Sequence, residues 1–296
     1  MVDGFLLIDK ASGRTSHDVV AAIRRATRIK KVGHAGTLDP MATGLLVLGL
    51  GKGTRLLRFV QDHAKEYEAR VQFGVATDSL DADGAILERE PMPVSEAEVV
   101  DAAARFRGTI LQVPPMVSAR RVGGRRLYEL AREGREVERE GRPVEIHELT
   151  VEDFAPSEYP EATLRVRCSK GTYIRTLADD IARALGGRAH LTALRRIANG
   201  SLRAGAAHTV DDVVAASERG TFADLVLSLR DGLVDMSEVV VSAEIGRGVS
   251  HGTPLAAAHL GREAGEGPVK VVGPSGELLA VYRIEGRRAV AEVVTA

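Results

Sequence analysis

The sequence is poor in cysteine, in long apolar runs and in any excess of one charge. Cys168 is the only cysteine, so no disulfide can form within the chain, which is consistent with a reducing compartment. No apolar run is long enough to span a membrane. The N-terminus lacks the basic segment and the long apolar segment of a signal peptide. We therefore expect a cytoplasmic protein that has no membrane partner.

The net charge of −1 argues against a uniformly basic nucleic-acid binder, but the charges are segregated along the chain. Residues 1–60 carry ten basic and four acidic residues, and residues 170–203 carry seven basic and two acidic residues. Residues 61–100 carry three basic and ten acidic residues. The two basic segments could bind a polyanion. Alternatively, they form solvated faces whose charges are paired with nearby acids, and composition leaves both interpretations open.

The 296 residues suffice for a catalytic core and one small domain, and 44% hydrophobic with 27% charged residues is typical of a globular protein. Apolar patterns predict strands at residues 5–8, 45–50, 65–74, 110–113, 144–154 and 162–169. Helices are predicted after an N-cap at Ser16, after a cap at Ser95, and at residues 54–60, 174–185, 209–219 and 221–230. Short strands at 239–241, 269–272, 278–284 and 289–294 follow. This mixture indicates an α/β or α+β core.

One carboxylate, Asp39, lies in a polar, Gly-rich loop directly before Pro40 and the apolar run 45–50. Proline pushes the preceding residue out of the α region, so Asp39 is expected to be extended at a loop–strand junction. An acid fixed beside a core strand is well placed for catalysis. On local chemistry alone, however, an Asx turn is the simpler interpretation of Asp before Pro.

A resemblance changes that interpretation. Residues 33–40 read Gly-His-Ala-Gly-Thr-Leu-Asp-Pro, and Ala-Thr-Gly follows at 42–44. This stretch resembles the signature loop of the TruB-family tRNA pseudouridine synthases, in the bacterial stand-alone type. The resemblance implies that Asp39 is the essential catalytic residue. It also implies that His34 stacks in the RNA and helps to hold the target uridine out of its loop.

Further motifs follow in the same order. Lys-Gly-Thr-Tyr-Ile-Arg at 170–175 is similar to the second family signature, which implies that Arg175 pairs with Asp39 and that Tyr173 lies against the target nucleotide. Arg175 falls in the first turn of a predicted helix, where a cation gains nothing from the helix dipole, so the residue pattern also calls for an anionic partner. Such a pair is expected to keep Asp39 ionised by lowering its pKa.

Three other substrate contacts are implied by the resemblance. Tyr67, in a Lys-x-Tyr context, is implied to stack on the flipped base, and Leu194, in the segment 190–196, to line the uracil pocket. Lys10 matches a lysine near the active site, although Ala11 replaces the proline that usually follows it. The plain alternatives are a core tyrosine, a core leucine and a surface lysine.

Two other motifs are rejected. Gly44 and Gly49 have the spacing of a phosphate-binding loop, but Leu50 stands where its lysine is required. Asp78, Asp81 and Asp83 are similar to a calcium loop but lack its full spacing and terminal glutamate. We therefore expect no metal and no cofactor.

The domain organisation follows from the same resemblance. We expect a catalytic domain over residues 1–237 and a small β-rich domain over 238–296, which resembles a PUA-type RNA-binding domain. Within the first domain, the arginine-rich residues 117–142 are implied to be an insertion that clamps the tRNA; the alternative is an ordinary exposed helix and loop. The implied fold is α+β, with a mixed, mostly antiparallel central sheet flanked by helices.

The function implied is the conversion of uridine 55 in the tRNA T loop to pseudouridine. Asp39 would act at the sugar, as a nucleophile at C1′ or as a base that gives a glycal, and Tyr173 could assist proton transfer. The expected partner is the T arm of tRNA, with no guide RNA and no obligatory protein partner. The alternatives are a non-catalytic tRNA chaperone, which would not require Asp39 with Arg175, and a synthase that acts on another RNA.

Overall fold

The computed structural model describes residues 2–118, 121–122, 124–127, 130, 133, 135, 137–261, 263 and 267–295. In the first half of the chain its elements are β1 (Gly4–Lys10), α1 (Ser16–Thr27), β2 (Val32–His34), β3 (Thr43–Leu50), η1 (Gly51–Arg55), α2 (Leu57–Gln61), β4 (Lys65–Phe73), β5 (Val75–Thr77), β6 (Ile86–Arg89), α3 (Glu96–Ala104), β7 (Gly108–Gln112), β8 (Arg121–Val122), β9 (Arg125–Arg126) and β10 (Arg142–Ala155). In the second half they are β11 (Glu161–Cys168), α5 (Ile174–Ala184), β12 (Ala189–Asn199), β13 (Leu202–Arg203), η2 (Ala204–Ala206), α6 (Val210–Arg219), η3 (Phe222–Leu225), η4 (Asp231–Leu233), β14 (Glu238–Val240), α7 (Ala243–Ser250), β15 (Leu255–Ala256), η5 (Ala257–Leu260), β16 (Val269–Val272), β17 (Leu278–Glu285) and β18 (Arg288–Val294).

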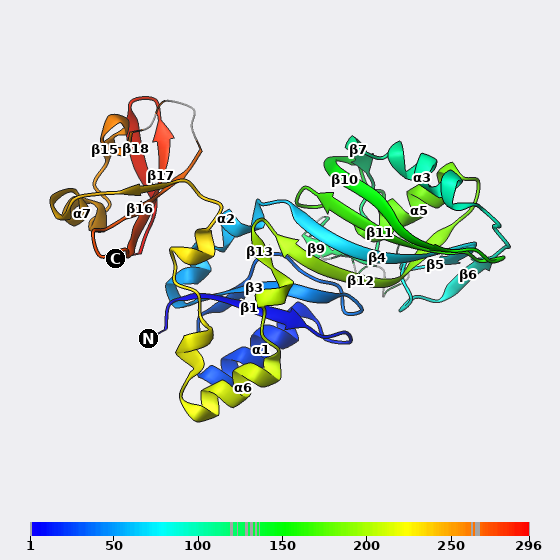
Figure 1. The fold of residues 1–296 in the computed structure, drawn as a ribbon, viewed down its shortest axis with the longest axis horizontal. Helices are drawn as coiled ribbons and strands as arrows, with labels where there is room; N and C mark the ends of the chain where they lie inside the picture. Colours follow the sequence, from blue (N-terminus) through cyan, green and yellow to red (C-terminus); the bar gives the residue numbers. More distant parts are fainter. Residues whose placement is uncertain are drawn as a thin grey trace.

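The core of the molecule is a nine-stranded sheet with the order β1-β3-β12-β4-β11-β10-β7, to which β2 and β13 are attached at β3 and β12 (Figure 1). Strand β12 joins its two halves. It pairs with β4 in antiparallel orientation and with β3 in parallel orientation, and all other described pairings of this sheet are antiparallel. This arrangement confirms the α+β class with a mixed, mostly antiparallel sheet.

Helices cover the sheet at both ends. Helices α1 and α6 lie side by side next to β1 and β3, whereas α3 and α5 pack together against β10 and β12 (Figure 1). The alternation predicted for residues 65–74 places Ala69, Val71 and Phe73 in the interior, and all three are fully buried. The apolar run 45–50 is likewise a buried strand, β3. Burial of these alternating side chains removes apolar surface from water and so stabilises the sheet.

Two local predictions are wrong. The N-cap of α1 is Thr15, whose side chain accepts from Asp18 N in a capping box, and Ser16 is the first helical residue. The helix predicted at 221–230 is replaced by the single turn η3 and an extended segment. Leu227 exchanges two main-chain hydrogen bonds with Phe5, at 2.9 and 2.8 Å, so its backbone extends the edge of β1 and cannot continue a helix.

The C-terminal part of the chain forms a separate five-stranded sheet with the order β14-β16-β17-β18-β15. This sheet docks on the first domain. Lys52 Nζ donates to Thr295 O at 2.6 Å, Arg55 Nη1 donates to Val294 O at 2.9 Å, and Arg58 pairs with Glu292 at 2.8 Å. Apolar residues of both domains, among them Phe5 and Val281, share one hydrophobic cluster. The fold therefore includes a β-rich C-terminal domain as expected, and its PUA-like character stays a prediction.

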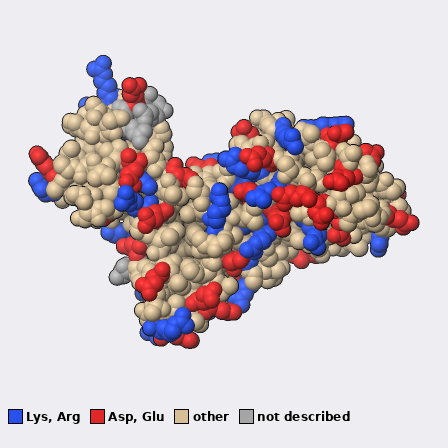
Figure 2. All heavy atoms as spheres, viewed as in Figure 1, with Lys and Arg blue, Asp and Glu red and all other residues tan. Residues whose placement is uncertain are grey.

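Charged side chains on the surface are intermixed (Figure 2). In the basic segment 170–203, ion pairs join Lys170 to Asp62, Arg183 and Arg188 to Asp179, and Arg195 to Asp9. These cations of the segment are therefore paired with nearby acids, whereas Arg196 and Arg203 bond to main-chain carbonyl oxygens. None of the described helices is both long and apolar enough to cross a membrane.

Candidate active site

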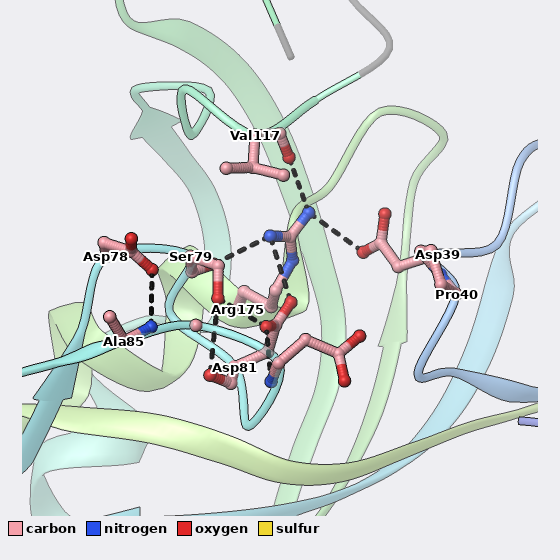
Figure 3. Close-up of a pocket in the computed structure, with 10 residues that line it drawn as sticks. Asp39, Pro40, Asp78, Ser79, Asp81, Ala85, Val117 and Arg175 are labelled. Carbon is pink, nitrogen blue, oxygen red and sulfur yellow. Dashed lines mark hydrogen bonds and ion pairs between the residues drawn. The ribbon is translucent and has the colours of Figure 1, made fainter. Parts of the chain in front are cut away.

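A cavity of about 300 Å³ lies where three segments meet: the loop before β3, the loop between β5 and β6, and the start of α5 (Figure 3). Its volume is at the lower end of the range for small-molecule sites. The residues that line it are Asp39, Pro40, Asp78, Ser79, Asp81, Asp83, Gly84, Ala85, Val117 and Arg175. It therefore brings together the two predicted residues Asp39 and Arg175, which are 136 positions apart in sequence.

Ser16, the first residue of α1, holds the loop that carries Asp39 in place through the main chain of Leu38. Ser16 Oγ accepts from Leu38 N at 3.0 Å and donates to Leu38 O at 3.3 Å. The turn after Asp39 is closed by the main chain, where Ala42 N donates to Asp39 O at 3.1 Å. The Asp39 carboxylate pairs with Arg175, and its side chain is 35% exposed. The Asx-turn interpretation is therefore wrong, and the carboxylate is presented to the cavity.

Arg175 is the second residue of α5, and four oxygen atoms hold its guanidinium. Its Nη2 lies 3.0 Å from Asp39 Oδ2 and donates to Val117 O at 2.8 Å. Its Nη1 lies 3.2 Å from Asp81 Oδ2 and donates to Ser79 O at 2.7 Å (Figure 3). The side chain is 3% exposed, so the guanidinium is a rigid partner for Asp39. Arg175 therefore has two anionic partners, Asp39 and Asp81, where one was expected.

The pKa of Asp39 shifts in the direction opposite to that expected from the ion pair alone. Burial of the carboxylate raises this pKa above its ordinary value, and the negative charge of Asp81 raises it further. Arg175 lowers the pKa, but its effect is outweighed. The expected effect of the ion pair is therefore present, but the net shift is upward because desolvation and the second carboxylate outweigh it.

Asp81 is the site residue that the sequence reasoning missed. It is 4% exposed, its Oδ1 accepts from Ser79 Oγ and from Asp83 N, and its Oδ2 faces Arg175. Asp78 Oδ1 accepts from Ala85 N at 3.0 Å, so these acids serve the turn itself. Among the described residues, no group of three His, Cys, Asp or Glu side chains is placed to hold a metal ion. The sequence contains one signal for this site, the cluster of three aspartates at 78, 81 and 83, but it does not indicate that Arg175 pairs with one of them.

Lys10 lies inside the protein, beneath the Asp39 loop. Its side chain is completely buried, and Nζ donates to Ala11 O at 3.0 Å, to Arg14 O at 2.7 Å and to Pro40 O at 3.1 Å. The interpretation as a surface lysine is wrong. Burial lowers the pKa of Lys10 to about 8, although the charge of Asp39 acts in the other direction. The geometry gives this ammonium group a role in holding the loop.

Tyr67 and Leu194 lie on the neighbouring strands β4 and β12. Tyr67 is half-buried and packs against the main core, and Leu194, 7% exposed, belongs to that core. Burial raises the pKa of the Tyr67 hydroxyl, whereas the positive charge of Arg196, its neighbour in register on β12, lowers that pKa.

His34 and Tyr173 flank the site without lining the cavity. His34 forms an edge-to-face contact with His17, with ring centroids 5.6 Å apart, and burial lowers its pKa. The backbone N and O of Tyr173 are held by the side-chain amide of Gln112 at 2.8 and 3.0 Å. Of the seven predicted residues, the cavity as described is lined by Asp39 and Arg175, and not by Tyr67, Leu194, Lys10, His34 or Tyr173.

Comparison with known families agrees with this geometry. Residues 24–174 match the model of the TruB family pseudouridylate synthase (N terminal domain), and residues 175–241 match that of the tRNA pseudouridylate synthase B C-terminal domain. The chain belongs to the TruB family of pseudouridylate synthases. The first match contains the Asp39 loop and the second begins at Arg175, so the cavity joins segments from both matches.

Curated members of the TruB family resemble this chain over most of its length. A protein named tRNA pseudouridine synthase B from Symbiobacterium thermophilum is 46% identical over 252 residues, which are 85% of this chain and 82% of the relative. A protein of the same name from Bacillus pumilus is 38% identical over 292 residues, which are 95% of this chain and 93% of the relative.

Solved structures share the fold of this TruB-family chain. The structure titled "Crystal Structure of a Cbf5-Nop10-Gar1 Complex" has a TM-score of 0.77 and 26% identity, and covers 99% of this chain and 84% of that one. An H/ACA RNP bound to a substrate RNA containing 2′-deoxyuridine has a TM-score of 0.75 and 25% identity, and covers 99% of this chain and 85% of that one. The likeness therefore extends over both domains.

Proposed function

We propose that this protein converts uridine 55 in the T loop of tRNA to pseudouridine, with Asp39 as the catalytic carboxylate. The observation that carries the proposal is the Asp39–Arg175 contact of 3.0 Å at a cavity of about 300 Å³. It occurs in a TruB-family chain whose curated relatives are named tRNA pseudouridine synthase B. A protein that only binds RNA would not need a buried arginine to fix a carboxylate at the edge of a cavity.

The reaction is an isomerisation, so its atoms balance without a co-substrate. The target uridine is first extruded from its stack, which costs unstacking energy. The N1–C1′ bond then breaks, the base turns, and a C5–C1′ bond forms, while C5 loses a proton and N1 gains one. Asp39 acts at the sugar, by bonding to C1′ or by removing the C2′ proton to give a glycal.

The other predicted residues have supporting roles in this proposal. Tyr67 stacks on the base, Leu194 lines the uracil pocket, and His34 helps to keep the base out of the loop. Tyr173 assists proton transfer at the sugar, and Lys10 contributes through the Pro40 carbonyl that it holds next to Asp39. The phosphate groups of the T arm would fix its position, because backbone contacts place a nucleic acid and pocket contacts select the base.

We further propose that the protein acts alone in the cytoplasm, without guide RNA or an obligatory protein partner. The catalytic domain would cover residues 1–237 and a PUA-like RNA-binding domain residues 238–296. Residues 117–142 would clamp the tRNA arm; part of this insertion, including Tyr128, lies outside the described residues. In support, the curated relatives cover nearly the same length of chain, and their names mention no further component.

The test uses an unmodified tRNA transcript with the wild-type protein, Asp39→Asn and the control Asp101→Asn, which changes an exposed acid on α3. Pseudouridine at position 55 is mapped by carbodiimide treatment and primer extension, and binding is measured by gel shift. We expect modification by the wild type and the control only, and binding by all three. Binding without modification by any of them would leave the chaperone or another RNA substrate. A primary isotope effect from deuterium at C2′ would select the glycal route.

A further inference from the structure

Gln112 is the last residue of β7, where the chain leaves the sheet toward the arginine-rich insertion. Its register partner is Arg142, the first residue of β10, so the chain leaves the sheet and returns to it at this pair. We call residues 112–117 the stem of the insertion. Gln112 is 2% exposed, and its amide bonds to one residue of another element, Tyr173, which precedes α5. The base of the insertion is therefore tied to the start of α5.

The two hydrogen bonds match the chemistry of a glutamine amide to that of one main-chain residue. Gln112 Nε2 donates to Tyr173 O at 3.0 Å, and Gln112 Oε1 accepts from Tyr173 N at 2.8 Å. A carboxylate in this place would only accept and an ammonium group would only donate, so neither could satisfy both main-chain groups. Within the described residues, the Tyr173 side chain does not cap α5. The amide of Gln112 thus fixes the first turn of this helix.

The stem holds α5 at a second point, next to the cavity. Val117 O accepts from Arg175 Nη2 at 2.8 Å, and the same Nη2 lies 3.0 Å from Asp39 Oδ2 (Figure 3). Val117 also lines the cavity. One end of the stem therefore binds the main chain at the start of α5, and the other end binds the guanidinium that faces Asp39. A displacement of the stem is transmitted to this guanidinium.

We propose that Gln112 is a positioning residue that ties the pair of Asp39 and Arg175 to the base of the insertion that clamps the tRNA. This inference rests on the proposed function and extends it. The guanidinium must hold the carboxylate in place when it reacts at the sugar, and a small displacement of a positioned group lowers a rate steeply. Because Gln112 acts through α5 and not on the RNA, its loss lowers the rate of the chemical step and leaves the tRNA affinity unchanged.

The test compares two variants of β7. Gln112→Leu removes both hydrogen bonds at similar side-chain volume. Ile110→Ala is the matched control, because Ile110 is partly buried against the main core and its truncation weakens the strand while the Gln112 amide stays in place. We expect Gln112→Leu to lower the single-turnover rate by about 10- to 100-fold, with the tRNA affinity within about threefold of the wild type. Ile110→Ala, measured below its melting temperature, should keep the wild-type rate.

Two further measurements separate positioning from a loss of stability. Arg175 lowers the pKa of Asp39, so a guanidinium that is held less firmly lets this pKa rise. The acid limb of the rate should therefore move to higher pH in Gln112→Leu. In addition, hydrogen exchange of the Tyr173 amide, measured without RNA, should be faster in Gln112→Leu than in Ile110→Ala, because only the first variant removes the acceptor of this amide.

The outcomes are distinct. A folded Gln112→Leu protein that forms pseudouridine as fast as Ile110→Ala overturns the proposal, because the amide would then serve stability alone. If Gln112→Leu does not fold, Gln112→Glu replaces it: the ionised carboxylate keeps the shape and the acceptor for Tyr173 N but loses the donor, and the same difference in rate decides. If the wild type makes no pseudouridine, the proposed function fails, whereas hydrogen exchange still shows whether Gln112 holds Tyr173.

Discussion

Replacement of Asp81 by Asn tests how the two carboxylates share Arg175. Asp81 is 4% exposed and accepts from Arg175, Ser79 Oγ and Asp83 N. An asparagine keeps one acceptor and turns an NH₂ group toward a donor. The loss of one hydrogen bond to a charged group in a buried position costs about 2 kcal/mol. For a chain of this size the melting temperature should fall by about 3 °C.

The same change has a distinctive effect on the pH dependence. The charge of Asp81 raises the pKa of Asp39, so its removal lowers that pKa. The acid limb of the rate of pseudouridine formation should therefore move to lower pH in Asp81→Asn, while the maximal rate falls by about tenfold because Arg175 is held less firmly. The assay is the single-turnover rate between pH 4.5 and 8, together with thermal unfolding at pH 7.

Two results would refute this reasoning. The first is a melting temperature equal to that of Asp101→Asn, which would show that Asp81 does not hold Arg175 in solution. The second is an acid limb that stays in place or moves to higher pH. In that case the charge of Asp81 would not act on Asp39 as the geometry requires.

Other perturbations give equally direct results. Asp39→Asn should abolish activity without loss of stability at pH 7. The pKa of Asp39 is higher in the folded protein than in the unfolded chain, so ionisation of Asp39 lowers the free energy of unfolding at a pH above the folded-state pKa. This loss of stability disappears at a pH below 3.8, the ordinary pKa that applies to the unfolded chain. Thermal unfolding at pH 7 and at pH 4 checks this, and a large loss at pH 7 would contradict it. Lys10→Met removes the buried donor to three main-chain carbonyls and should destabilise the protein by about 3 kcal/mol, measured by urea unfolding against Lys30→Met, which changes an exposed lysine. Cys168 is fully buried and its pKa is raised to about 11 by burial, so a thiol reagent should label it in urea and not in the folded protein.

The parts of the fold that depend on local patterns were predictable from sequence. The alternation at 65–74 gives β4, the apolar run at 45–50 gives β3, and the Ser95 cap with Glu98 starts α3. The predicted contact between Asp39 and Arg175 is present, because each motif by itself lacks a partner that the other supplies.

Features set by tertiary contacts were not predictable. Thr15 and Ser16 are adjacent hydroxyl residues, and the choice of Thr15 as N-cap depends on Ser16 being used by Leu38. The helix expected at 221–230 fails to form because Leu227 pairs with Phe5, far away in sequence. The importance of Asp81 likewise follows from the way its loop packs against Arg175, which no local spacing encodes.

The position of β12 has a consequence for the synthesis of the chain. Arg196 Nε bonds to Leu45 O across 151 positions of sequence, and β12 is the strand that joins β3 to β4. Such a long-range pairing loses a large loop-closure entropy before its hydrogen bonds and packing contribute to stability, so it forms late in folding. On the ribosome, the sheet stays divided until about two thirds of the chain has emerged, and β4 meanwhile offers an unpaired edge. A nascent or truncated chain without β12 therefore lacks the strand that holds the half of the sheet with the Asp39 loop next to the half with β4.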